Sequence, residues 1–147
     1  MRLIGPIAAF LIGSAIVAAP AAAKDIVVQM KNKGTDGLMV FEPSFVQAAK
    51  GDKIHFVPTD KGHNAEMIPG MFPDGVTKSG GAMNQEYVLT ATKPGLYGIK
   101  CLPHFGMGMV ALVKVGTGPA PNAAAAAAAS MPPLARKRMD PLLAAAK

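Results

Sequence analysis

The segment from Cys101 to Met109 places the only cysteine of the chain, one of its three histidines and two methionines within nine residues. The flanking segments, residues 96–100 and 109–115, are rich in Ile, Leu and Val, a composition typical of β-strands. Two strands that fix both ends of a short loop confine its side chains to a small volume. We therefore expect Cys101, His104 and a methionine to converge in a ligand loop.

Thiolate and thioether sulfur are soft ligands and imidazole is borderline, so this set favours copper over calcium, magnesium or manganese. Zinc fits less well, because its sites use further Cys or His in place of a thioether. A second nitrogen is available from His63, in a Gly-His-Asn motif that follows the predicted strand 53–57. Either Met107 or Met109 could supply the thioether on chemistry alone, and Met109 begins the next strand. Two His, one Cys and an axial Met form the ligand set of blue-copper electron-transfer sites.

The pairing of Gly62-His63-Asn64 with Cys101-x-Pro103-His104-x-x-Met107-Gly108-Met109 resembles the pseudoazurins, a family of small cupredoxins. The resemblance covers residues 24–116 closely and the remaining tail loosely. It implies a Greek-key β-sandwich with two C-terminal α-helices that binds one type 1 copper. Carried over by position, it implies the ligands His63, Cys101, His104 and Met109, and leaves Met107 as a loop residue that does not bind the metal.

The same resemblance implies a periplasmic monomer that carries single electrons between redox proteins. Nitrite reductase, in denitrification, is the implied acceptor, and a cytochrome c-type protein is the expected donor. An amicyanin-like or plastocyanin-like carrier with another partner is the close alternative. A periplasmic copper carrier is a further alternative, to which the ten methionines could point.

Three residues beside the candidate ligands are expected to support the site: Asn64, Pro103 and Met107. Asn64 follows His63 directly, so hydrogen bonds from it could join the His63 loop to the Cys101 loop and hold the ligands in orientation. A turn asparagine with left-handed backbone is the plainer and compatible interpretation. His55 lies within a predicted strand, between Ile54 and Phe56, and is expected to be an ordinary imidazole outside the site.

Several lysines lie next to ligand residues or in turns that could reach the same end of the molecule. They would steer an acidic partner toward His104 and raise the association rate more than the affinity. A scatter of solvated lysines is the alternative interpretation. With an apolar centre that includes Phe105, the predicted docking residues are Lys33, Lys61, Lys78, Lys100 and Phe105.

The N-terminal residues have the pattern of a cleavable signal peptide: Arg2, an apolar stretch over residues 3–19, and a small-residue cleavage site at Ala21-Ala22-Ala23. A membrane anchor is less consistent with the glycines and prolines of this stretch, so no anchor is expected after cleavage. Cleavage would lower the formal net charge from +6 to +5. We expect three regions: a signal peptide over 1–23, a cupredoxin (plastocyanin-like) domain over 24–116, and a linker with a helical tail over 117–147.

Short apolar segments between Gly and Pro turns favour an all-β sandwich. The predicted strands cover residues 24–30, 38–41, 45–49, 53–57, 86–90, 96–100 and 109–115. Turns are expected at 32–34 and 35–37, and residues 68–81 are expected to form a long loop with one helical turn.

In the tail, Asn122 is expected to cap a helix over the alanines 123–129, with low-complexity disorder as the alternative. A second helix should begin after Pro133. Pro141 lies inside it and predicts a kink, or a restart of the helix capped by Asp140.

Composition excludes several functions. A copper nitrite reductase or multicopper oxidase needs further histidines for its catalytic coppers, and only His55 remains after the site is built, so no enzyme activity is expected. The single cysteine permits no internal disulfide. Nothing in the chain resembles a nucleic-acid-binding module, and the modest positive charge does not require one.

Overall fold

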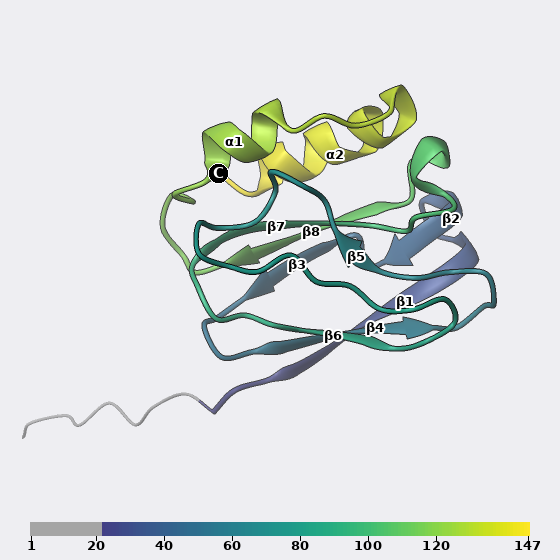
Figure 1. Ribbon diagram of the computed structural model, residues 1–147, viewed down its shortest axis with the longest axis horizontal. Coiled ribbons are helices and arrows are strands. Elements are labelled where there is room, and N and C mark those ends of the chain that lie inside the picture. Colours follow the sequence, from purple (N-terminus) through teal and green to yellow (C-terminus); the bar gives the residue numbers. More distant parts are fainter. Residues whose placement is uncertain (1–21) are drawn as a thin grey trace, which may run out of the picture.

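The computed structural model describes residues 22–147, and two four-stranded β-sheets face each other in it (Figure 1). The predicted signal peptide lies, apart from its last two residues, outside the described residues. One sheet has the order β2-β1-β4-β6 and the other β3-β8-β7-β5. The strands are β1 (Asp25–Gly34), β2 (Gly37–Glu42), β3 (Phe45–Ala48), β4 (Lys53–Pro58), β5 (Glu66–Met67), β6 (Tyr87–Thr90), β7 (Gly95–Lys100) and β8 (Val110–Val115).

All seven predicted strands are confirmed, with three local differences. The predicted turn at 32–34 is wrong: β1 runs on to Gly34, because pairing with β2 gives these residues ladder partners, and the hairpin needs only Thr35 and Asp36. The two-residue strand β5 was not predicted. Residues 68–81 form the expected loop without a helical turn, and the buried Met71 packs directly against Gly98 of β7.

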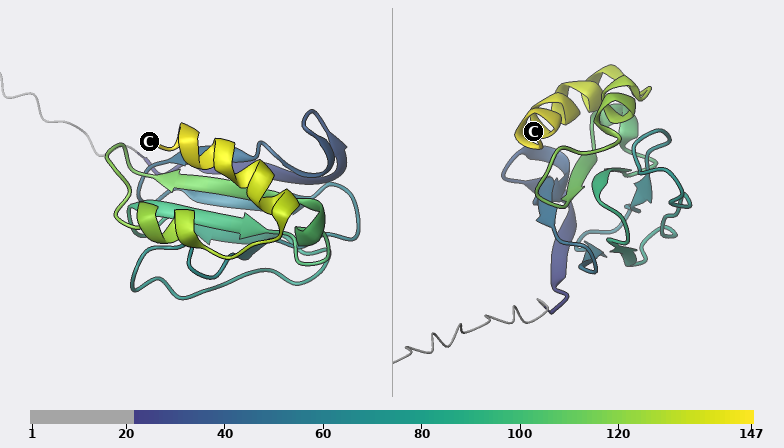
Figure 2. Two further views of the ribbon diagram at one scale, coloured as in Figure 1. Left: turned by 90° about the horizontal axis from the view of Figure 1, so that it is seen from above. Right: turned by 90° about the vertical axis from the view of Figure 1, so that its left-hand side faces the viewer.

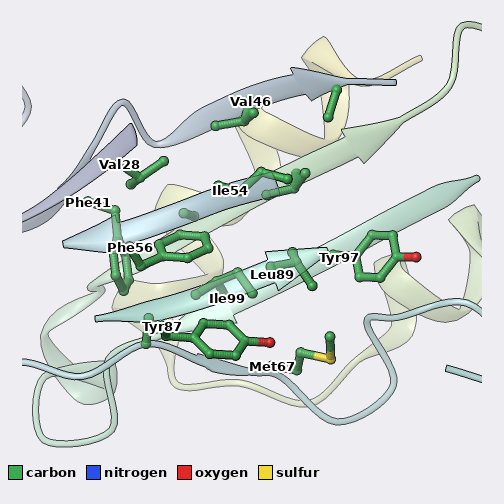
Figure 3. Close-up of a cluster of buried hydrophobic side chains, with 14 of the residues drawn as sticks. Val28, Phe41, Val46, Ile54, Phe56, Met67, Tyr87, Leu89, Tyr97 and Ile99 are labelled. Atoms are coloured by element: carbon green, nitrogen blue, oxygen red, sulfur yellow. The ribbon is translucent and has the colours of Figure 1, made fainter. Parts of the chain in front are cut away.

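The main core lies between the two sheets (Figure 3). In β4, the side chains of Ile54 and Phe56 are fully buried while His55 between them is only half-buried, as the two-residue period of a strand requires. Phe56 meets Phe41 edge to face with ring centroids 5.7 Å apart and stacks on Tyr87 at 5.9 Å. Each such aromatic pair adds about 0.5–1.5 kcal/mol to the gain from burial.

Two C-terminal helices, α1 (Ala123–Ala128) and α2 (Pro133–Ala145), lie on the outer face of the sheet that contains β7 and β8 (Figure 2). A second apolar cluster joins Leu112 of β8 to Ala126, Ala135 and Met139 of the helices. All six residues of β8 are buried, since β8 has the core on one face and the helices on the other. Within residues 22–147 no helix is both long and apolar enough to cross a membrane.

Both predicted helices are confirmed, but the predicted cap by Asn122 is wrong, and the restart at Pro141, one of its two alternatives, does not occur. The side chain of Asn122 makes no capping hydrogen bond and instead binds the backbone of Leu96 in β7. The α2 helix continues through Pro141 without a restart, and Asp140 pairs with Arg136 one turn earlier. Pro141 has no backbone N–H, so the helix loses the hydrogen bond to the carbonyl of Lys137. Lys137 is exposed, so water can bind that carbonyl instead. The buried side of the helix meanwhile packs against the sheet and keeps the helix in place.

Candidate metal centre

Three side chains from two loops meet at one end of the sandwich. The distance from His63 Nδ1 to His104 Nδ1 is 3.1 Å, and Cys101 Sγ lies 3.7 Å from the first and 3.5 Å from the second. Among residues 22–147 this is the only group of three or more His, Cys, Asp and Glu side chains close enough together to hold a metal ion. His63 and Cys101 are fully buried and His104 is half-buried.

The dimensions of this triangle fit a transition metal. A point equidistant from its three donor atoms lies about 2.0 Å from each, close to the roughly 2.0–2.3 Å at which imidazole nitrogen and thiolate sulfur bind such metals. Two borderline nitrogens and one soft sulfur suit copper.

The two loop methionines differ sharply in environment. Met109 is completely buried, whereas Met107 is 47% exposed. The backbone N–H of Met109 donates to the carbonyl of His104 at 3.1 Å, and the carbonyl of Met109 accepts from the N–H of Cys101, also at 3.1 Å. Met109 is therefore the buried methionine that the backbone joins directly to two of the three clustered residues.

Local structure holds the loop between β7 and β8 tightly. The N–H of His104 donates to the carbonyl of Cys101, and the short 3-10 helix η1 (Phe105–Met107) follows. Gly108 then takes a left-handed conformation, with φ of 86°, which glycine adopts at little cost. The loop turns back within a few residues, as the nine-residue spacing from Cys101 to Met109 predicted.

Hydrogen bonds with Asn32 and Asn84, two residues that the sequence alone did not indicate, orient His63. Nε2 of His63 lies 2.9 Å from Oδ1 of Asn32, so Nε2 carries the proton and Nδ1 presents its lone pair to the cluster. Oδ1 of Asn84 accepts the N–H of Gly62 at 2.6 Å, and the N–H of Asn84 donates to the carbonyl of His63. Only the parallel pairing of β1 with β4 could have pointed to Asn32, because it brings the end of β1 beside the loop after β4.

Asn64 joins the two ligand loops. Its Oδ1 accepts the N–H of Leu102 at 2.7 Å, and its Nδ2 donates weakly to the carbonyl of Gly81 and to Glu66. Pro103, in contrast, is exposed on the outside of the loop. The positions of His63 and Cys101 are thus coupled through a buried side chain.

Burial changes the acid–base properties of the cluster. Desolvation lowers the pKa of His63, and the nearby His104 adds to this effect. Desolvation raises the pKa of the Cys101 thiol, opposed by the backbone N–H groups of Asn64 and His104. A neutral imidazole is ready to bind a metal, whereas the thiol must lose its proton, so metal binding releases protons.

The predicted docking residues differ in their surroundings. Lys33, Lys61 and Lys78 are exposed. Lys100 is mostly buried, pairs with Glu66 at 3.3 Å, and lies 4.9 Å from the ring centre of the half-buried Phe105.

His55 lies outside the cluster and bridges two carboxylates. Its Nδ1 is 2.5 Å from Glu86 and its Nε2 is 3.1 Å from Asp25. Both ring nitrogens are thus engaged away from the metal-binding group.

Comparison with known proteins places this fold and cluster in a class. The sequence family described as copper binding proteins of the plastocyanin/azurin family matches residues 28–116, so the chain is a cupredoxin. It is 55% identical over 128 residues to the pseudoazurin of Paracoccus pantotrophus, covering 87% of this chain and 88% of that protein.

Two crystal structures agree with this result. The pseudoazurin from Methylobacterium extorquens AM1 superposes with a TM-score of 0.80 at 47% identity, covering 84% of this chain and 99% of the other. The pseudoazurin from Hyphomicrobium denitrificans superposes with a TM-score of 0.77 at 44% identity, covering 82% of this chain and 97% of the other. The chain belongs to the pseudoazurin family.

Membership of this family makes the chain a type 1 blue-copper electron-transfer protein whose cofactor is copper and whose partners are redox proteins. The donor atoms fit that cofactor in kind and in spacing. Within residues 22–147 the one such cluster lies at one end of the sandwich.

Proposed function

We propose that His63, Cys101, His104 and Met109 are the copper ligands of a periplasmic one-electron carrier that donates to nitrite reductase. The triangle of donor atoms, 3.1–3.7 Å on each side, is the observation that carries the ligand assignment. The complete burial of Met109, against the 47% exposure of Met107, supports Met109 as the residue that would supply the thioether.

Copper, when bound, supplies the change between Cu(I) and Cu(II). The residues supply a fixed environment: the backbone bonds among Cys101, His104 and Met109 keep the donor atoms in place in both states. The burial of His63 and Cys101 excludes water. His104 alone is partly exposed among the three clustered donors, which supports its edge as the route by which an electron leaves.

The surface near His104 suits a brief contact with a partner. Pro103 and Met107 are exposed beside it and, with Phe105, form an apolar centre. The charges of Lys33, Lys61 and Lys78 are exposed to solvent and would steer an acidic partner. Lys100 contributes less net charge, since Glu66 pairs with it, and instead packs near Phe105.

We also propose roles for the regions of the chain and for the mature protein as a whole. Residues 1–23 act as a signal peptide that directs the protein to the periplasm and leaves no membrane anchor. Residues 24–116 form the cupredoxin domain and residues 117–147 the linker and helical tail. The mature protein works as a monomer, receives electrons from a cytochrome c-type donor and is not an enzyme, because His55, the one histidine left over, has both ring nitrogens on carboxylates.

Stopped-flow reoxidation of the reduced protein by nitrite reductase, at several ionic strengths, tests the proposed partner and surface. We expect the reoxidation rate to fall as the salt concentration rises. The double variant Lys61→Gln/Lys78→Gln should be reoxidised several-fold more slowly than wild type at low salt. Lys53→Gln is the matched control, because Lys53 is exposed at the opposite end of β4 and should leave the rate unchanged. A rate that ignores salt would exclude the steering role of the lysines. No reoxidation by nitrite reductase, with rapid reoxidation by another redox protein, would favour the amicyanin-like or plastocyanin-like alternative.

A further inference from the structure

The guanidinium of Arg138, in α2, binds three backbone carbonyls that lie far away in the sequence. Its Nη1 donates to Met39 at 2.9 Å and to Gly108 at 3.1 Å, and its Nη2 donates to Leu38 at 3.0 Å. The first turns of α2 lie beside the loop that holds η1 (Figure 2). One side chain of the C-terminal helix thus connects β2 to the candidate ligand loop.

The carbonyl of Gly108 and the N–H of Met109 belong to the same peptide group. Arg138 holds the carbonyl, and the carbonyl of His104 accepts the N–H at 3.1 Å. The plane of this peptide is therefore fixed from both sides. The carbonyl of Met109 accepts in turn from the N–H of Cys101 at 3.1 Å, so the planar peptides on both sides of Met109 are fixed and its own backbone bonds have little freedom to rotate.

The helix also packs closely against this peptide. A Cβ atom added to Gly108 would lie 2.9 Å from the carbonyl oxygen of Leu134 and 3.1 Å from Cδ of Arg138. The same nitrogen, Nη1, also donates to the carbonyl of Met39, which has a left-handed backbone with φ of 51°, a conformation uncommon outside glycine. Both Gly108 and Met39, whose carbonyls Arg138 binds, have positive φ.

We propose that Arg138 is a positioning residue for the copper ligand loop, which sets the orientation of the Gly108–Met109 peptide and so the place of the Met109 thioether. The inference rests on the proposed role of Met109 as a ligand. Charge-assisted hydrogen bonds to three carbonyls make the position rigid, and the potential of a blue-copper site depends on its axial ligand. The C-terminal helix thereby has a function at the metal beyond covering the sheet.

Two substitutions of Arg138 and one control test this role in the full chain. Arg138→Met keeps the apolar stem and removes every donor, and Arg138→Lys restores a single point charge. The control, Arg136→Met, removes the same residue type two positions earlier, where the guanidinium binds Ala129 and Asp140 and not the ligand loop. All three should fold, because Arg136 and Arg138 are both partly exposed and the substitutions leave the buried contacts of Ala135 and Met139 with the sheet intact.

Amide hydrogen exchange at Met109, in the metal-free and Cu(I)-loaded proteins, is the first readout. We expect exchange about tenfold faster in Arg138→Met, an intermediate rate in Arg138→Lys and no change in Arg136→Met. The second readout is the reduction potential with the thiolate-to-copper absorption. The potential should rise in Arg138→Met, since a looser thioether stabilises Cu(II) less, and Arg138→Lys should recover part of the change.

An Arg138→Met protein that is less stable to heat, yet has wild-type exchange at Met109 and a wild-type spectrum and potential, would overturn the inference and leave Arg138 as an anchor of the helix. Equal changes in Arg136→Met would overturn it as well. If wild-type protein forms no thiolate-to-copper band, the ligand assignment itself fails, and the exchange rates still support or refute the contact with the loop.

Discussion

Asn32 and His63 share the hydrogen bond that decides which imidazole nitrogen faces the metal site. The acceptor is the side-chain oxygen of Asn32, 2.9 Å from Nε2, and the backbone N–H of Asn32 donates in turn to Asp60 at 2.7 Å. The asparagine is therefore held in place by the same loop that carries His63. Partners of this kind fix the tautomer and orientation of a metal-binding histidine.

Replacing Asn32 with Ala should weaken copper binding. Loss of the acceptor frees the ring of His63 to rotate or change tautomer, and such changes cost about tenfold to a hundredfold in metal affinity. A competition titration with a chelator of known affinity measures the effect. Asn122→Ala, which removes an asparagine far from the cluster, should leave the affinity unchanged, and equal losses in the two variants would contradict the proposed role of Asn32.

For single residues, the sequence predicts those contacts that follow from short spacing along the chain. Cys101, His104 and Met109 lie in one loop between two strands, so their convergence follows from local order. The contribution of Asn32 depends on a pairing between distant strands, which local sequence does not specify. The same holds for Lys100, whose charge is offset by Glu66 through the pairing of β5 with β7.

At the scale of elements, Asn122 takes the place of a missing strand. β5 pairs with β7 only at Ile99 and Lys100, which leaves Leu96 without a strand neighbour on that side. The side chain of Asn122 accepts from the N–H of Leu96 at 2.9 Å and donates to its carbonyl at 2.8 Å, as a neighbouring strand would. The clamp also fastens the start of α1 to the sheet.

Asn122→Ala should lower the free energy of unfolding by about 2–3 kcal/mol, because it removes two hydrogen bonds and leaves the polar backbone of a buried residue unpaired. Denaturant unfolding of the full chain measures the loss. Asn122→Asp is a sharper comparison, since it keeps the acceptor for the N–H of Leu96 but places a second acceptor against the carbonyl of Leu96, and so should not recover the stability. Unchanged stability in Asn122→Ala would show that water satisfies Leu96 equally well.

His55 links β4 to both neighbouring strands through Asp25 of β1 and Glu86 next to β6. Hydrogen bonds from Glu86, then Asp25, raise the pKa of His55 above its ordinary value of 6.5. The folded protein thus binds this proton more tightly than the unfolded chain does. The stabilisation is fully present below about pH 6.5 and is lost as the pH rises through the raised pKa of the folded protein.

His55→Gln should therefore destabilise the protein mainly in mild acid. We expect a difference in the free energy of unfolding of about 1 kcal/mol or less near pH 6, since both carboxylates are largely exposed, and convergence with wild type near pH 9. Denaturant melts of the two proteins across this range measure the difference. A difference that is the same at every pH would assign the effect to packing.

The helical tail shows which helix features local sequence predicts and which depend on distant contacts. Alanine runs favour helix, and both helices form where composition predicts them. The restart that was one of two alternatives at Pro141 does not occur, because the packing of Ala135 and Met139 against the sheet outweighs one lost backbone bond. Asn122 likewise binds Leu96 of β7 and does not cap α1, because of a contact that is distant in sequence.

At the scale of the whole molecule, two apolar clusters share β8. One lies between the sheets and contains Cys101 and Met109, and the other lies under the helices. Because β8 follows directly on Met109, the helices that cover β8 also support the loop with the candidate ligands. The candidate ligand Met109 thus directly precedes a strand whose six residues are all buried, which suits a carrier that must not rearrange on electron transfer.

Addition of Cu(II) to the metal-free full chain distinguishes a blue-copper site from the other kinds of copper site. We expect an intense visible thiolate-to-copper absorption that saturates at one copper per chain, is abolished in Cys101→Ala, is changed in Met109→Leu and is unaltered in the matched control Met107→Leu. A colourless complex that holds only Cu(I), as expected of a copper carrier, or a band that persists without Cys101, would contradict this expectation.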